Sequence, residues 1–163
     1  MEENSPNKRN KIADFVLKVG RLIPGFASYE NKESIRENDH KIRIYCSENL
    51  KSASTTLNKI KQTLGDEDDD VLLNIDKVQA KIRNQADRMI YAKHGYSDLF
   101  DKSKEGEFEK VLLSLVDHDQ AVLDLSEGFL SYVKEAGASD INLILIKLEE
   151  IEVALNNRSK TLY

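Results

Sequence analysis

Proline is confined to the start of this chain, at Pro6 and Pro24, and none follows over the rest of its 163 residues. A β-sandwich or barrel of this size needs turn residues about every 8–12 positions, which proline and glycine usually supply. The chain has only seven glycines to supply such turns. Long helices suit this composition, because proline is the strongest helix breaker. The sequence therefore predicts an all-α protein.

Apolar residues recur at helical spacing in five segments, residues 12–23, 27–64, 70–94, 107–135 and 141–155. The clearest seam lies in the second segment and advances in steps of three and four: Ile42, Cys46, Leu50, Ala53, Leu57, Ile60 and Leu64. Four long amphipathic helices after a short one predict an antiparallel four-helix bundle with an additional N-terminal helix. We expect residues 1–9 to be a flexible N-terminus and residues 10–163 to form a single domain.

Charge is distributed unevenly along the chain. The net charge is −5, but five basic residues against Asp14 alone give residues 7–23 a charge of +4, which leaves −9 for the remainder. This balance argues against a nucleic-acid partner. Cys46 is the single cysteine and cannot form an internal disulfide, and no apolar signal segment or membrane span is visible. We therefore expect a cytoplasmic protein.

Metal and catalytic motifs are incomplete. A diiron bundle needs two Glu-x-x-His pairs, and this sequence has one, at residues 37–40. The acidic loop 66–70 lacks the glycine and glutamate that a calcium-binding EF-hand loop requires. No glycine-rich phosphate loop or nucleophile elbow occurs. We expect no cofactor, no metal, no catalytic residue and no enzyme activity.

Asp119 is the one carboxylate that helical spacing places on an apolar seam, between Leu115 and Val122. A carboxylate there needs an ion pair or hydrogen bonds. We predict a buried polar network of Asp119 with Asp87 and Arg88, and Arg43 and Arg36 are further candidate partners. Two interpretations remain: a pocket that binds a ligand or a metal, and a salt link that fixes helix register, which we favour.

Two segments outside the main seam are candidates for contacts with other molecules. Residues 8–23 place basic side chains around an apolar stripe, a pattern found both in helices that lie on membranes and in helices that cover the end of a bundle. Residues 28–41 are more polar than the rest of the second helix. We expect that stretch to project from the bundle, to be only partly helical or to meet a partner.

Two sequence segments suggest a relationship. Residues 23–29 read I-P-G-F-A-S-Y, and residues 86–91 read A-D-R-M-I-Y and lead into G-Y-S-D-L-F-D at residues 95–101. They resemble a family of small uncharacterised microbial helical proteins to which no activity is attached. With the charged run that follows the first segment, the resemblance points to a candidate interaction surface formed by Pro24, Gly25, Tyr29, Arg36, Asp39, Tyr96 and Phe100.

Taken together, these patterns favour a non-enzymatic interaction or scaffold protein with a helical-bundle fold. Its partner would be another protein or a second copy in an oligomer. Two alternatives remain open. The first is a ligand- or metal-binding bundle with a polar site around Asp119. The second, which is less favoured, is a peripheral membrane protein attached through residues 8–23.

Overall fold

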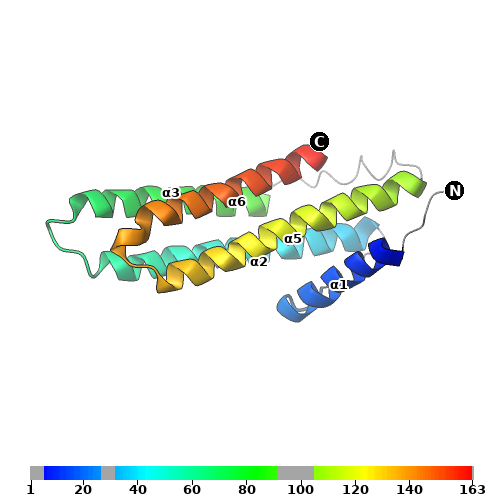
Figure 1. Ribbon diagram of the computed structural model, residues 1–163, viewed down its shortest axis with the longest axis horizontal. Helices are drawn as coiled ribbons and strands as arrows, with labels where there is room; N and C mark the ends of the chain where they lie inside the picture. Colours follow the sequence, from blue (N-terminus) through cyan, green and yellow to red (C-terminus); the bar gives the residue numbers. More distant parts are fainter. Residues whose placement is uncertain (1–5, 27–31, 92–104, 163) are drawn as a thin grey trace.

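The computed structural model describes residues 6–26, 32–91 and 105–162, and all regular structure within them is helical. The prediction of an all-α protein is confirmed, and five α-helices pack against one another (Figure 1). In chain order the elements are α1 (Pro6–Leu22), α2 (Lys32–Lys61), α3 (Asp69–Tyr91), α5 (Glu105–Glu135), the short 3-10 helix η1 (Ala138–Asp140) and α6 (Ile141–Leu162).

The four long helices form two hairpins that lie side by side. Helix α3 returns antiparallel to α2, and α6 returns antiparallel to α5 (Figure 1). Between the hairpins, α2 lies beside α5 and α3 beside α6, and each of these pairs runs parallel, because α5 begins at the same end of the molecule as α2. Neighbouring helices are therefore antiparallel within each hairpin and parallel between the hairpins, which differs from the expected fully antiparallel order.

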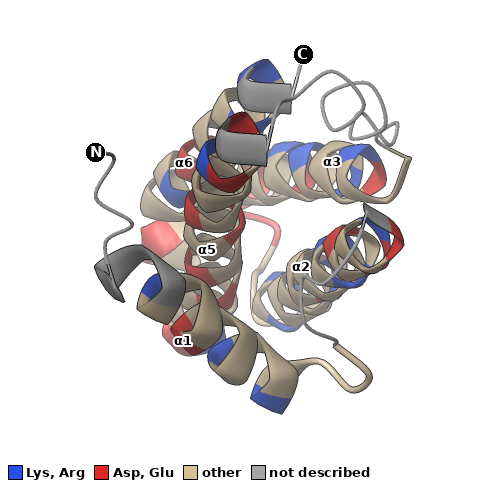
Figure 2. Cartoon of the chain, turned by 90° about the vertical axis from the view of Figure 1, so that its right-hand side faces the viewer, with Lys and Arg blue, Asp and Glu red and all other residues tan. Residues whose placement is uncertain are grey.

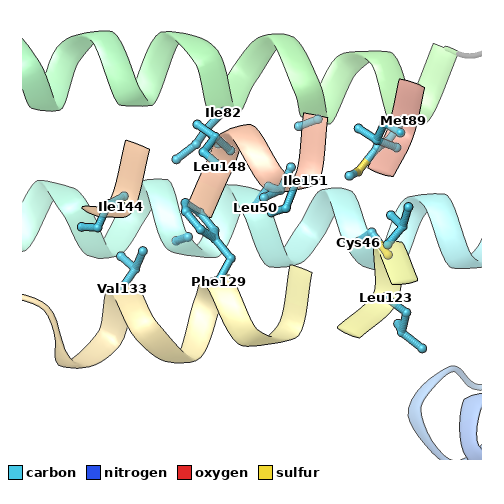
Figure 3. Packing of buried hydrophobic residues seen from close by; sticks show 14 of the residues in the cluster. Cys46, Leu50, Ile82, Met89, Leu123, Phe129, Val133, Ile144, Leu148 and Ile151 are labelled. Atoms are coloured by element: carbon cyan, nitrogen blue, oxygen red, sulfur yellow. The ribbon is translucent and has the colours of Figure 1, made fainter. Parts of the chain in front are cut away.

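The core follows the apolar seams. Along α2, the seam residues from Ile42 to Leu57 are each at most 1% exposed. They pack with apolar residues of the other three long helices, among them Ile82, Leu123, Phe129 and Leu148 (Figure 3). Burying a side chain of this size contributes about 1.5–3 kcal/mol of transfer free energy. The helical spacing thus identifies the residues that hold the four helices together.

The N-terminal part of α2 does not project from the core. Ile35 is fully buried and packs with Leu112 and Leu115 of α5. Asn38 and Asp39 are buried as well. Two of the polar residues in this part of α2 are therefore packed inside the protein, and the expectation of a projecting segment is wrong for this described part.

Helix α1 lies along α5 (Figure 2). Lys11 Nζ is 2.6 Å from Asp117 Oδ1, and Lys18 Nζ is 2.6 Å from Asp124 Oδ1. From the first ion pair to the second, the residue number rises by seven on both helices, so α1 and α5 run parallel. Helix α1 begins at Pro6, within the segment expected to be a flexible terminus, and proline is favourable in a first helical turn.

The apolar stripe of α1 faces the core. Phe15, Val19 and Ile23 are buried, and the Phe15 ring packs edge-on against Phe26. A helix that lies on a membrane needs this stripe exposed to lipid. In this arrangement the stripe is covered by protein instead. Within the described segments, no helix combines the length and the apolarity that a membrane crossing requires.

Candidate functional site

A cluster of four charged side chains lies buried between the helices. Asp39 and Arg43 come from α2, Asp119 from α5 and Arg158 from α6, and each residue is at most 6% exposed. Two acidic and two basic groups give the cluster a formal charge of zero. Because an isolated buried charge is very costly, such groups remain inside a protein only when they are paired. We refer to these four residues as the ion cluster.

Arg158 connects the two carboxylates of the ion cluster. Its Nε donates to Asp119 Oδ1 at 2.7 Å, and its Nη2 donates to Asp39 Oδ1. Arg43 Nε donates to the other oxygen of Asp39, Oδ2, at 2.9 Å. Arg43 Nη1 also donates to the Met89 carbonyl of α3 at 2.7 Å. All four long helices are therefore joined at one level by charge-assisted hydrogen bonds.

The local sequence explains why these side chains face inward. Asp39 lies four residues after Ile35 and three before Ile42, which are both buried seam residues. Asp119 follows Leu115 by four residues, and Arg158 follows Leu155 by three. Residues three or four apart share a helix face. The ion cluster thus occupies seam positions on three helices.

Asp119 is the unusual member of the ion cluster. Burial raises the pKa of its carboxyl group from 3.8 to about 8, and the positive charge of Arg43 opposes this rise. Oδ2 of Asp119 has no hydrogen-bond partner among the described residues, so a proton on that oxygen would displace no bond. Among all the residues that the structure describes, no group of three or more His, Cys, Asp or Glu side chains is placed to hold a metal ion.

A cavity of about 460 Å³ lies against the ion cluster, between the C-terminal parts of α3 and α6. The two arginines of the cluster, Arg43 and Arg158, form part of its wall. The remaining lining residues are Asn84, Asp87, Arg88, Met89, Tyr91, Leu155 and Ser159. A volume of this size is typical of sites for small molecules.

The structure does not bring Asp119 together with Asp87 and Arg88, the partners predicted for it. Asp119 is buried and bonded to Arg158, whereas Asp87 and Arg88 are exposed on α3 and line the cavity. Arg88 Nη2 donates to Asn156 Oδ1 of α6 at 2.6 Å, and its Nη1 lies 3.7 Å from Glu152 Oε1. Sequence reasoning named Arg43 among the candidate partners but missed Arg158.

The candidate interaction surface is also divided. Asp39 is 2% exposed, so its assignment to a surface is wrong, because it belongs to the ion cluster. Arg36 is half-buried, and Pro24 and Gly25 are exposed. Gly25 has a φ of +75°, which favours glycine, and its carbonyl accepts a hydrogen bond from Lys41 Nζ at 2.5 Å. Tyr29, Tyr96 and Phe100 lie outside the described residues.

A second surface was not found from the sequence. Helix α6 buries one apolar face in the core and exposes three further apolar residues on its opposite side. Leu143, Ile146 and Val153 are 45%, 52% and 57% exposed, and their spacing of three and seven residues places them on one side of the helix. We refer to these three residues as the outer face of α6.

Comparison with models of protein families, with curated proteins and with solved structures finds no match for this chain. The resemblance to a family of small microbial helical proteins therefore stays a prediction.

Cys46 provides a chemical test of core burial. Burial raises the pKa of its thiol from 9.0 to about 12, and a hydrogen bond with Ser126 opposes the rise. The thiolate is the reactive form. At pH 8 we expect the folded chain to react with a thiol reagent at least about a thousandfold more slowly than the chain unfolded in guanidinium chloride. A comparable rate in the folded chain would contradict the burial of Cys46.

Proposed function

We propose that this chain is a non-enzymatic interaction protein of the cytoplasm, built as a four-helix bundle of α2, α3, α5 and α6 with α1 added along α5. One observation carries the proposal: α6 packs one apolar face in the core and exposes three further apolar residues, Leu143, Ile146 and Val153, on its opposite side. Exposed apolar residues that share one side of a helix can mark a site of protein–protein contact. We infer that the outer face of α6 is covered by a partner.

The partner that fits this surface is an amphipathic helix with a basic residue between its apolar residues. The exposed charged residues between Leu143 and Val153 are Glu149, which pairs with Lys81 of α3, and Glu150. A helix laid along this face would place apolar side chains against Ile146 and a lysine or arginine against the Glu150 carboxylate. Two copies of α6 paired across a twofold axis would bring the Glu150 carboxylates together, which disfavours a second copy as the partner.

Two synthetic helical peptides can test this proposal by fluorescence anisotropy. They share one apolar stripe and differ only in a central lysine or glutamate. We expect the full chain to bind the lysine peptide at least about fivefold more tightly, in line with the cost of placing like charges together. Ile146→Asn should weaken binding to the lysine peptide about tenfold, because it removes an apolar contact from the centre of the surface.

Leu73→Asn is the matched control, since Leu73 is 54% exposed on α3 and lies outside this surface. It should bind the lysine peptide as the unmodified chain does. Equal binding of the two peptides, no binding, or equal losses in the two variants would contradict the proposal. Sedimentation velocity completes the test by measuring self-association. If the chain forms a concentration-dependent dimer and Ile146→Asn abolishes it, the partner of this surface is a second copy of the chain and not a different protein.

A further inference from the structure

The cavity between α3 and α6 is independent of the outer face of α6 and suggests a second kind of binding. Three arginines, Arg43, Arg88 and Arg158, are among the residues that line it. Guanidinium groups present N–H donors in a planar fork that matches the oxygens of phosphate and carboxylate groups. We propose that this cavity binds a small organic anion through these three arginines.

The position of the acidic groups supports an anion. Asp39 and Asp119 neutralise the buried arginines, yet neither carboxylate lines the cavity. Burial raises the pKa of Asp119 to about 8, so at neutral pH its carboxyl group carries less than a full negative charge. Of the residues that line the cavity, three are basic and Asp87 is acidic, so the lining carries a formal charge of +2, which favours an incoming negative charge.

The rest of the lining describes the other part of the ligand. Met89 and Leu155 are buried apolar side chains that can contact a hydrocarbon portion. Asn84 and Ser159 offer neutral polar groups, and Asp87 can accept a hydrogen bond from a hydroxyl group. The ligand class is therefore a small molecule with a phosphate or carboxylate group, an apolar portion and a hydroxyl group.

Arg88 allows this site to be tested without disturbing the core. Its side chain is 41% exposed and pairs with Glu152 of α6. Lys81 lies seven residues earlier on α3, is 46% exposed and pairs in the same way with Glu149 of α6, but it does not line the cavity. Arg88→Gln and Lys81→Gln each remove one exposed cation between the same two helices. The second variant is thus the matched control.

The full chain labelled with ¹⁵N is titrated by NMR with inorganic phosphate in one series and with benzoate in another, at constant ionic strength set with chloride. We expect saturable shifts at the amides of residues 84–91 and 155–159. Arg88→Gln should raise the dissociation constant at least about fivefold, and Lys81→Gln should leave it unchanged within twofold.

The two series distinguish the source of the negative charge. Saturation with phosphate alone assigns a phosphate ligand, saturation with benzoate alone assigns a carboxylate, and saturation with both supports the shared chemistry. Three results would overturn the site: shifts that do not saturate, shifts spread over surface lysines, or an equal loss in both variants. None of them bears on the outer face of α6, so this site and the proposed function can fail separately.

Discussion

Replacing Arg158 with leucine is expected to lower the free energy of unfolding by about 3–5 kcal/mol, the usual cost of breaking a buried ion pair from one side. Arg158 is the donor that Asp39 and Asp119 share, and both carboxyl groups are buried. Without Arg158, Asp119 Oδ1 loses the hydrogen bond that this arginine donates, whereas Asp39 keeps the hydrogen bond from Arg43. Urea denaturation followed by circular dichroism at neutral pH measures the change.

Lys160→Leu is the control for this measurement. Lys160 is an exposed cation two residues further along α6, so its replacement should change the free energy of unfolding by less than about 1 kcal/mol. If Arg158→Leu also loses less than about 1 kcal/mol, the ion cluster does not hold the helices together.

Replacing all four members of the ion cluster with apolar residues should be far less damaging than replacing Arg158 alone. Apolar side chains of similar volume often restore or exceed the stability of a buried ion pair, because no desolvated charge remains. A variant with Asp39→Leu, Arg43→Met, Asp119→Leu and Arg158→Met is therefore expected to regain at least half of the loss. A further loss beyond that of Arg158→Leu would contradict this account.

The second large effect is a dependence of stability on pH that arises from Asp119. Its carboxyl group has a pKa of about 8 in the folded chain and 3.8 as the ordinary value, which we take for the unfolded chain. Between these values the folded state binds the proton more strongly. The stabilisation that protonated Asp119 gives to the folded state is therefore fully present below about pH 4 and is lost as the pH rises through about 8. The free energy of unfolding falls by up to about 1.4 kcal/mol per pH unit over this range.

Asp119→Asn isolates this contribution, because an amide keeps the shape of the carboxyl group and cannot ionise. We expect the free energy of unfolding of the unmodified chain to fall relative to that of this variant as the pH rises from 5 to 8. Asp117→Asn is the control, since Asp117 is exposed on the same helix. A difference that is constant with pH would show that Asp119 remains ionised across this range.

The helical seams could be predicted because they depend on local spacing. From Ile42 to Leu57 every seam residue predicted on α2 is buried, and Asp119 is buried where its spacing from Leu115 places it. Helix formation and the facing of a side chain depend on neighbours three and four residues away. A single sequence displays that information directly.

The partners of Asp119 could not be predicted in the same way. Arg158 lies 39 residues from Asp119 and 119 residues from Asp39, so their pairing depends on how α2, α5 and α6 pack. Local periodicity contains no information on which helices become neighbours. One signal was nevertheless present: Asp39 continues the seam of Ile35 and Ile42, and Arg43 follows it by four residues, the spacing of a helical ion pair.

The ion cluster also divides evenly between the two hairpins. The α2–α3 hairpin contributes Asp39 and Arg43, and the α5–α6 hairpin contributes Asp119 and Arg158. Each half of the chain therefore contributes one acid and one base that are bonded to each other in the folded structure. Of the hydrogen bonds described for the ion cluster, the bond from Arg158 to Asp39 is the one between two of its members that crosses from one half to the other. A single arginine of α6 thus aligns the two halves of the chain at this level.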